Sequence, residues 1–207
     1  MVREIIFASL LFVTITSFAE EAIDALKKQL TQFSTIQGNF EQLIHDNYGE
    51  LLQHSTGKMA VERPQHFRWY TDEPTEQLII SNGTKLWVYD IDLEQVTVEK
   101  FQSTYGSLPA LLLTGEVAQL EQRFEVDYQK KGALDVYRLT PKQISNEEMF
   151  QWVELSFYHS KIKQMHLLDN LEQHTELRFS NVHLNQHVSA EQFNFNPPAG
   201  VDVIVKD

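Results

Sequence analysis

Nucleophiles, metal ligands and phosphate-binding loops are the features that would indicate catalysis, and this sequence offers few candidates for them. It contains no cysteine, no G-x-S-x-G nucleophile elbow and no glycine-rich phosphate loop after a predicted strand. Among its eight scattered histidines, His183 and His187 have an i, i+4 spacing, but their segment is polar and lacks an H-E-x-x-H motif. The sequence therefore predicts neither an enzyme, nor a metal site, nor a bound cofactor.

One cation, Arg63, is notable for its neighbours. It lies in the aromatic-rich stretch 58–89, which contains no catalytic motif. Period-2 alternation in an extended chain places Arg63 on the same side as Val61 and, further along, Phe67 and Trp69. A cation that faces apolar groups needs a partner. Two interpretations stay open: a functional contact with another element, or an ordinary cation paired at the end of a strand.

Residues 1–19 have the pattern of a secretory signal peptide. Arg3 is followed by an apolar run that ends in the small-x-small sequence Ser17-Phe18-Ala19, so we expect cleavage before Glu20. The alternative is a membrane anchor, but the run is shorter than the ~20 residues that a spanning helix needs. Because the chain has no cysteine, it can be neither lipidated there nor disulfide-bonded.

Residues 20–207 have the length of one domain that buries a substantial core. The net charge of −12 speaks against nucleic acid as a partner, because phosphate binding requires clustered lysine and arginine. The acidic excess favours solubility or a basic partner surface.

The remaining chain predicts one amphipathic helix followed by many short strands. Apolar residues at helical spacing, including Leu26 and Leu30, predict a helix over 20–33. The pair Asn82-Gly83 predicts a hairpin with a type I′ turn. Capping-box spacing after Ser189 predicts a short helix. Strand-like segments are expected at 35–45, 51 onward, 77–89 (as a hairpin), 95–101, 124–129, 134–139, 151–158, 162–168, 172–179, 193–196 and 201–205.

A run that is apolar on every side, 108–113, interrupts these strands. Pro109 at its start and Gly115 after it predict a short helix. Such a helix must be covered on both sides, either as ordinary core or facing a ligand. A second short helix is expected near 116–122. Short connections make the strands antiparallel, so the pattern predicts a strongly curved sheet with helices over its concave face, an arrangement that can enclose a greasy ligand.

An ordered set of short motifs resembles the LolA family of periplasmic carriers of outer-membrane lipoproteins. The set comprises Arg63-Pro64, Phe67-Arg68-Trp69, the turn Asn82-Gly83 and Leu86-Trp87-Val88-Tyr89, and extends from the first helix through 108–113 to Phe193-Asn194-Phe195-Asn196-Pro197-Pro198-Ala199-Gly200. The resemblance implies a mainly β fold with a helical lid: an unclosed antiparallel β-barrel of about ten or eleven strands covered by short α-helices.

The resemblance also implies a function and a set of site residues. Such a periplasmic chaperone binds the acyl chains of lipoproteins released by an inner-membrane ABC transporter complex and delivers them, as a monomer, to an outer-membrane receptor. Arg63 would be the latch that ties the lid to the barrel through backbone contacts. The cavity wall and the underside of the lid would include Leu30, Phe67, Trp69, Leu111, Leu113 and Met165.

Two other functions remain as alternatives. A periplasmic module of the same fold that senses lipids or lipoproteins would bind the same ligands, although sensors of this kind generally carry an additional domain. A lipid hydrolase is the third, and it lacks a nucleophile constellation.

Overall fold

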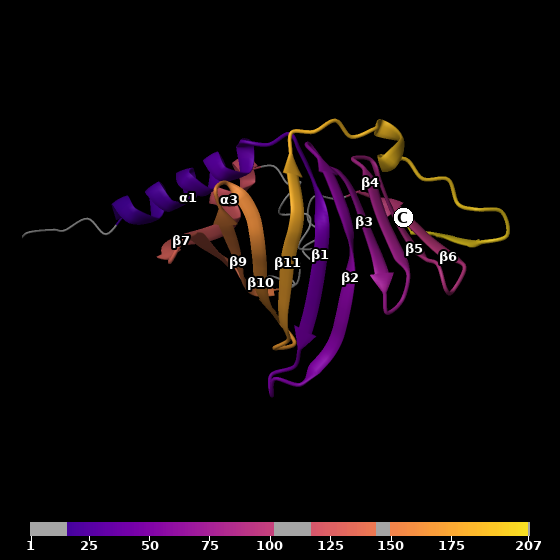
Figure 1. Ribbon diagram of the computed structural model, residues 1–207, viewed down its shortest axis with the longest axis horizontal. Helices are drawn as coiled ribbons and strands as arrows, with labels where there is room; N and C mark the ends of the chain where they lie inside the picture. Colours follow the sequence, from indigo (N-terminus) through magenta and orange to yellow (C-terminus); the bar gives the residue numbers. More distant parts are fainter. Residues whose placement is uncertain (1–15, 102–116, 144–149, 207) are drawn as a thin grey trace, which may run out of the picture.

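One curved sheet of twelve strands forms most of the protein (Figure 1). The computed structural model describes residues 16–101, 117–143 and 150–206. The strand order is β12-β6-β5-β4-β3-β2-β1-β11-β10-β9-β8-β7. The strands are β1 (Thr35–His45), β2 (Leu51–Glu62), β3 (His66–Glu73), β4 (Gln77–Asn82), β5 (Lys85–Asp90), β6 (Gln95–Lys100), β7 (Phe124–Lys131), β8 (Leu134–Pro141), β9 (Phe150–Tyr158), β10 (Lys161–Asp169), β11 (His174–Leu184) and β12 (Asp202–Val205).

The predicted fold class is confirmed: the sheet is unclosed, with β7 and β12 at its two edges. Eleven of the strands form antiparallel neighbours, as their short connections require. The exception is β12, which pairs parallel to β6. The two are far apart in sequence, so the chain has room to cross over the sheet and return in the same direction.

Strand β1 joins the two halves of the sheet. It pairs with β2 along one side and with β11 along the other. Strands β2 to β6 and β7 to β11 are each a succession of antiparallel neighbours in chain order. The long-range β1–β11 pairing is what converts these two meanders into one surface.

The first helix covers the concave face of this surface. Helix α1 (Thr16–Thr31) begins four residues before the expected cleavage point and ends two residues before Phe33. Its residues Ile23, Leu26 and Leu30 are buried in one cluster with concave-face side chains from both halves of the sheet. Their spacing of three and four residues puts them on one side of the helix, as predicted.

Helix α3 (Val117–Arg123) lies where a second short helix was expected and packs against α1 and β7. The apolar run 108–113, predicted as a helix, lies outside the described residues. Among the helices that the structure does describe, none combines the length and the apolar character that crossing a bilayer would require.

The hairpin at Asn82 is confirmed, but its predicted turn type is wrong. A type I′ turn needs positive φ at both central residues, and at this turn only Gly83, at φ 81°, has one. Strand β4 continues through Asn82, whose Oδ1 accepts hydrogen bonds from the backbone N–H groups of Thr84 and Lys85. The asparagine therefore closes the turn with its side chain.

The segment after β11 crosses the convex face, and it does not form the strand that was predicted there. Ser189 caps a short 3₁₀ helix, η1 (Ala190–Phe193), as its spacing predicted. The expected strand at 193–196 is absent from this described segment. Instead, Phe193 is buried with Ala60 and Val188, while Phe195 packs on a separate convex cluster that includes Ile80 and Trp87. The alternation reflects two anchors on a surface, without strand pairing.

Candidate functional site

The concave face collects four of the predicted site residues in one buried cluster. Leu30 comes from α1, Phe67 and Trp69 from β3, and Met165 from β10. Each is at most 7% exposed. The cluster therefore includes one residue of the lid and three of the wall, drawn from both halves of the sheet. The other two predicted residues, Leu111 and Leu113, lie outside the described part of the chain.

A stacked aromatic pair forms part of the wall. The rings of Phe40 and Trp69 lie 3.9 Å apart between centroids, with 22° between their planes. Phe40 was not predicted as a site residue. Its even spacing from Ile36 along β1 places both on the concave face, so periodicity could have identified it.

Gly57 in β2 leaves room for this pair. A Cβ at this position would lie 2.6 Å from Cζ of Phe40 and would collide with the backbone carbonyl oxygen of Tyr70. Glycine inside a strand often marks a close approach of another group. That signal was present in the sequence, but it does not say which group approaches.

Arg63 lies in the turn between β2 and β3. Its backbone N–H donates a hydrogen bond to the carbonyl oxygen of Ser34 at 2.8 Å. Its guanidinium carbon is 4.9 Å from the centroid of the Phe33 ring. Both contacts are to the segment that connects α1 to β1. The predicted latch residue thus lies beside the C-terminal end of the lid helix.

The environment of Arg63 is partly apolar, as its neighbours in the sequence indicated. Val61, Phe67 and Phe33 belong to the concave cluster, and Arg63 itself is half-buried. Burial lowers the pKa of its guanidinium to about 10, because desolvation disfavours the charged form. The group remains charged at neutral pH. A cation–π contact with Phe33 compensates part of this cost.

Polar contacts join the two described helices of the lid. The Lys27 ammonium of α1 is 2.7 Å from Oε2 of Glu121 in α3. The hydrogen bond from Lys27 lowers the pKa of the Glu121 carboxyl, and the same bond raises the pKa of Lys27. Lys142 donates a hydrogen bond to the Glu121 backbone carbonyl. These contacts lie on the solvent side, so the lid is apolar beneath and polar above.

Chemically, the described concave face offers apolar contact. The described residues contain no group of three or more histidine, aspartate or glutamate side chains placed to hold a metal ion. A concave apolar surface beneath an amphipathic helix is suited to a flexible hydrocarbon, because hydrophobic contact has no directional requirement.

Similarity to known proteins agrees with this geometry. The family described as "Outer membrane lipoprotein carrier protein LolA" matches residues 31–196. An outer-membrane lipoprotein carrier protein of Pseudomonas paraeruginosa is 37% identical over 206 residues, which cover 99% of this chain and 98% of the relative. One from Azotobacter vinelandii is 40% identical over 185 residues, with coverage of 89% and 88%.

A solved structure is similar in fold alone. The crystal structure of a LolA superfamily protein from Nitrosomonas europaea has a TM-score of 0.50 and 12% sequence identity, and the match covers 86% of this chain and 98% of that one. Family membership rests on the sequence matches, which extend over the strands and the lid helix that build the concave cluster. The chain belongs to the LolA family of outer membrane lipoprotein carrier proteins.

Proposed function

We propose that this chain is a periplasmic chaperone that binds the acyl chains of lipoproteins against its concave face. The observation that carries the proposal is the apolar cluster shared by α1 and both halves of the sheet. The names of its relatives indicate the cargo. The chain acts as a binder without catalysis, because the concave face offers hydrocarbon contact and no nucleophile motif is present in the sequence.

The proposal includes a route for the cargo. The chain, matured by removal of residues 1–19, receives lipoproteins from an inner-membrane ABC transporter complex and passes them to an outer-membrane receptor. It works as a soluble monomer of one domain. The acidic balance of the chain, −12, supports solubility in transit.

Magnitudes explain how an apolar lid opens for an apolar cargo. Burying one ~16-carbon chain contributes on the order of 12 kcal/mol, at ~0.8 kcal/mol per methylene. Each contact of Arg63 described above is weaker: a cation–π pair contributes about 0.5 to 2 kcal/mol, and a backbone hydrogen bond about 1 kcal/mol. In this proposal acyl chains displace the lid because their own apolar contacts with the sheet replace those of α1, while the loss of the closed-state contacts of Arg63 favours later release.

Arg63 is the latch in this proposal, and a transfer assay tests it. The purified protein is loaded with a radiolabelled lipoprotein released from inner-membrane vesicles, and transfer to the purified receptor is followed. We expect Arg63→Leu to form the soluble one-to-one complex but to release it slowly, because the closed lid no longer competes with the cargo.

Arg138→Leu is the matched control. Arg138 also lies over an aromatic ring, that of Trp152 at 4.2 Å, but is paired with Glu154 away from the lid. It should transfer at the wild-type rate. Wild-type transfer by Arg63→Leu would contradict the latch. Failure of the unmodified protein to form a soluble complex would contradict the carrier function itself, and hydrolysis of the lipid would favour an enzyme.

A further inference from the structure

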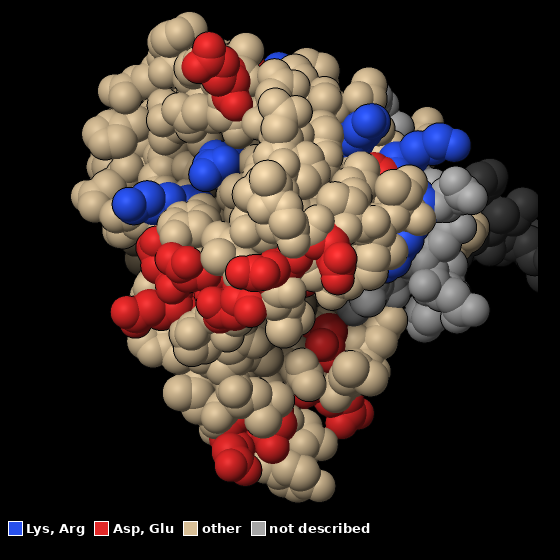
Figure 2. Space-filling view, turned by 90° about the vertical axis from the view of Figure 1, so that its right-hand side faces the viewer, with Lys and Arg blue, Asp and Glu red and all other residues tan. Residues whose placement is uncertain are grey.

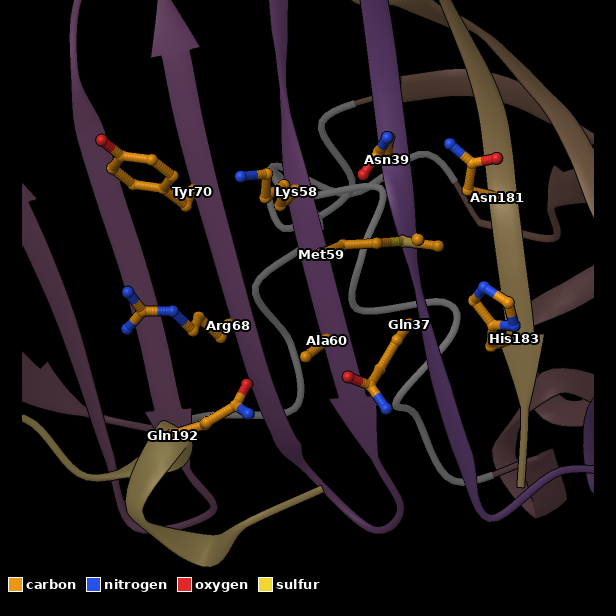
Figure 3. A pocket seen from close by; sticks show the side chains of 11 residues that line it. Gln37, Asn39, Lys58, Met59, Ala60, Arg68, Tyr70, Asn181, His183 and Gln192 are labelled. Atoms are coloured by element: carbon orange, nitrogen blue, oxygen red, sulfur yellow. The ribbon is translucent and has the colours of Figure 1, made fainter. Parts of the chain in front are cut away.

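A polar hollow lies on the convex face of the sheet, opposite the apolar cluster (Figure 3). Its volume is about 520 Å³, within the range of roughly 300–1,000 Å³ typical of small-molecule sites. Strands β11, β1, β2 and β3 form its floor, and Gln192 of η1 lies at its rim. Lys58 and Arg68 contribute to the floor and alternate along their strands with Met59, Phe67 and Trp69, which face the concave cluster.

The lining of this hollow contains two strong bases and no acidic side chain. It includes Lys58, Arg68 and His183 but no aspartate or glutamate, although the chain has 29 acidic residues against 17 lysines and arginines. Figure 2 illustrates the contrast, because acidic side chains form a broad band on the face that it shows. A lining without acidic side chains in so acidic a chain is a local reversal of charge.

The two strong bases of the hollow have no carboxylate partner within the described residues. Lys58 and Arg68 are absent from the ion pairs formed there, whereas Lys27, Lys130 and Arg178 each pair with an acidic side chain. Arg68 is half-buried, so its charge is partly removed from water, and this burial lowers the pKa of the guanidinium. An anion in the hollow would offset that cost.

Neutral hydrogen-bond donors also line the hollow. The carboxamides of Gln37, Asn39 and Asn181 line the hollow beside the two cations. Asn181 lies at a register shift between β1 and β11 and has φ of 52°; such bulges re-aim side chains. Ammonium, guanidinium and carboxamide N–H groups from different strands approach an oxyanion from several directions, which matches a tetrahedral phosphate better than a planar carboxylate.

We propose that this hollow binds a phosphate group that is attached to a small polar group such as glycerol or a sugar. Lys58 and Arg68 contact the phosphate. A phosphate alone would fill only part of the volume, so room remains for an attached glycerol or sugar. The group could belong to a free phosphate ester or to a phospholipid headgroup. The site is independent of the acyl-binding face, because the sheet separates the two.

Calorimetry on the purified full chain tests the site, with glycerol 3-phosphate as the probe in a low-salt buffer. We expect saturable binding that is at least tenfold weaker in the Lys58→Gln/Arg68→Gln variant, because charge-assisted hydrogen bonds are lost. Lys85→Gln/Lys206→Gln is the control, since it removes the same charge from exposed positions outside the lining. Arg68→Lys keeps a cation in the hollow and should retain most of the binding.

Flotation with vesicles distinguishes the two sources of phosphate. Binding to phosphatidylglycerol vesicles that requires Lys58 and Arg68 would assign a headgroup, whereas binding of glycerol 3-phosphate alone would assign a free ester. The site is refuted if neither probe binds, or if the variant and the control lose binding equally. Loading with lipoprotein should be unchanged in the Lys58→Gln/Arg68→Gln variant, so this outcome is separable from the carrier function.

Discussion

Gly57 has no side chain, and this absence lets the concave wall pack closely around it. The strand brings this residue directly beneath the edge of the Phe40 ring, which stacks on Trp69. The carbonyl of Tyr70 closes the remaining space on the neighbouring strand. A side chain at this position would have to displace both an aromatic ring and backbone, and a packed interior resists such shifts.

We therefore expect Gly57→Ala to reduce the free energy of unfolding by about 3 kcal/mol, the upper end of the usual cost of overpacking. Urea unfolding measures the loss, and the fluorescence of Trp69 should change because its stacking partner moves. Gly132→Ala is the comparison: a Cβ there meets nothing within 4 Å, although the backbone has φ of 60°. It should cost about 1 kcal/mol without a change in fluorescence. Equal losses would contradict the steric account.

At the scale of elements, the C-terminal segment acts as a strap on the convex face. Phe193 and Phe195 anchor it at two separate points, one beside His66, at 5.5 Å between ring centroids, and one beside Tyr89, at 5.6 Å. Beyond these anchors the chain enters β12 and pairs with β6. The strap therefore holds the edge strand in place from outside the sheet.

Phe193→Ala should lower the free energy of unfolding by about 3 kcal/mol, because the ring is 2% exposed and its removal leaves a cavity. Limited proteolysis should then cleave within 185–201 faster, while urea unfolding reports the stability. Glu191→Ala, at an exposed position of the same short helix, should change neither. Unaltered proteolysis of Phe193→Ala would show that Phe193 is not needed to hold the segment on the sheet.

Sequence periodicity identified the elements well where each pairs with its neighbour in the chain. The strand at 35–45 has the predicted limits, and the meander from 124 onward differs by one or two residues at most ends. The segment 193–196 was wrong because alternation shows only that a chain is extended with one side on apolar groups. It does not distinguish a strand from a strap. The turn at Asn82 was also wrong in type, because side-chain capping competes with positive φ.

The candidate site was harder to predict from the sequence than the helices and strands were. Local spacing predicts on which side of its helix or strand each of Leu30, Phe67, Trp69 and Met165 lies. That these side chains come together in one cluster depends on the β1–β11 pairing, which no local pattern encodes. The hollow around Lys58 and Arg68 was missed for the same reason. Its lining comes from four strands and a short helix, and each contributes only one or two polar residues that resemble ordinary solvated positions.

At the scale of the whole molecule, ionised carboxylates make stability depend on pH. Hydrogen bonds from Lys27 to Glu121, from Lys130 to Asp135 and from Arg178 to Glu176 each lower the pKa of the carboxyl group. A carboxyl whose folded pKa is lowered contributes stability above its unfolded value, here 3.8 to 4.5. That contribution is lost as the pH falls through the lowered folded value.

The free energy of unfolding should therefore decline as the pH is lowered from about 5 towards 3, and the decline should be shallower in the variant Glu121→Gln/Asp135→Asn/Glu176→Gln. Urea unfolding across this range gives the slope for each protein. The variant should also be slightly less stable at neutral pH, since surface pairs contribute little individually. Identical slopes would show that other carboxylates dominate the acid response.

The position of β1 has a consequence for the order of folding. This strand is synthesised before every other strand and meets β2 at once, but its second edge has no partner until His174–Leu184 has been made. An unpaired strand edge is a template for aggregation, and closing so long a loop is slow. We expect the amides of β11 and those on the second edge of β1 to gain protection last in pulse-labelling hydrogen exchange. A chain of a lipoprotein carrier family thus leaves one edge of its own central strand unpaired until almost all of the chain has been synthesised.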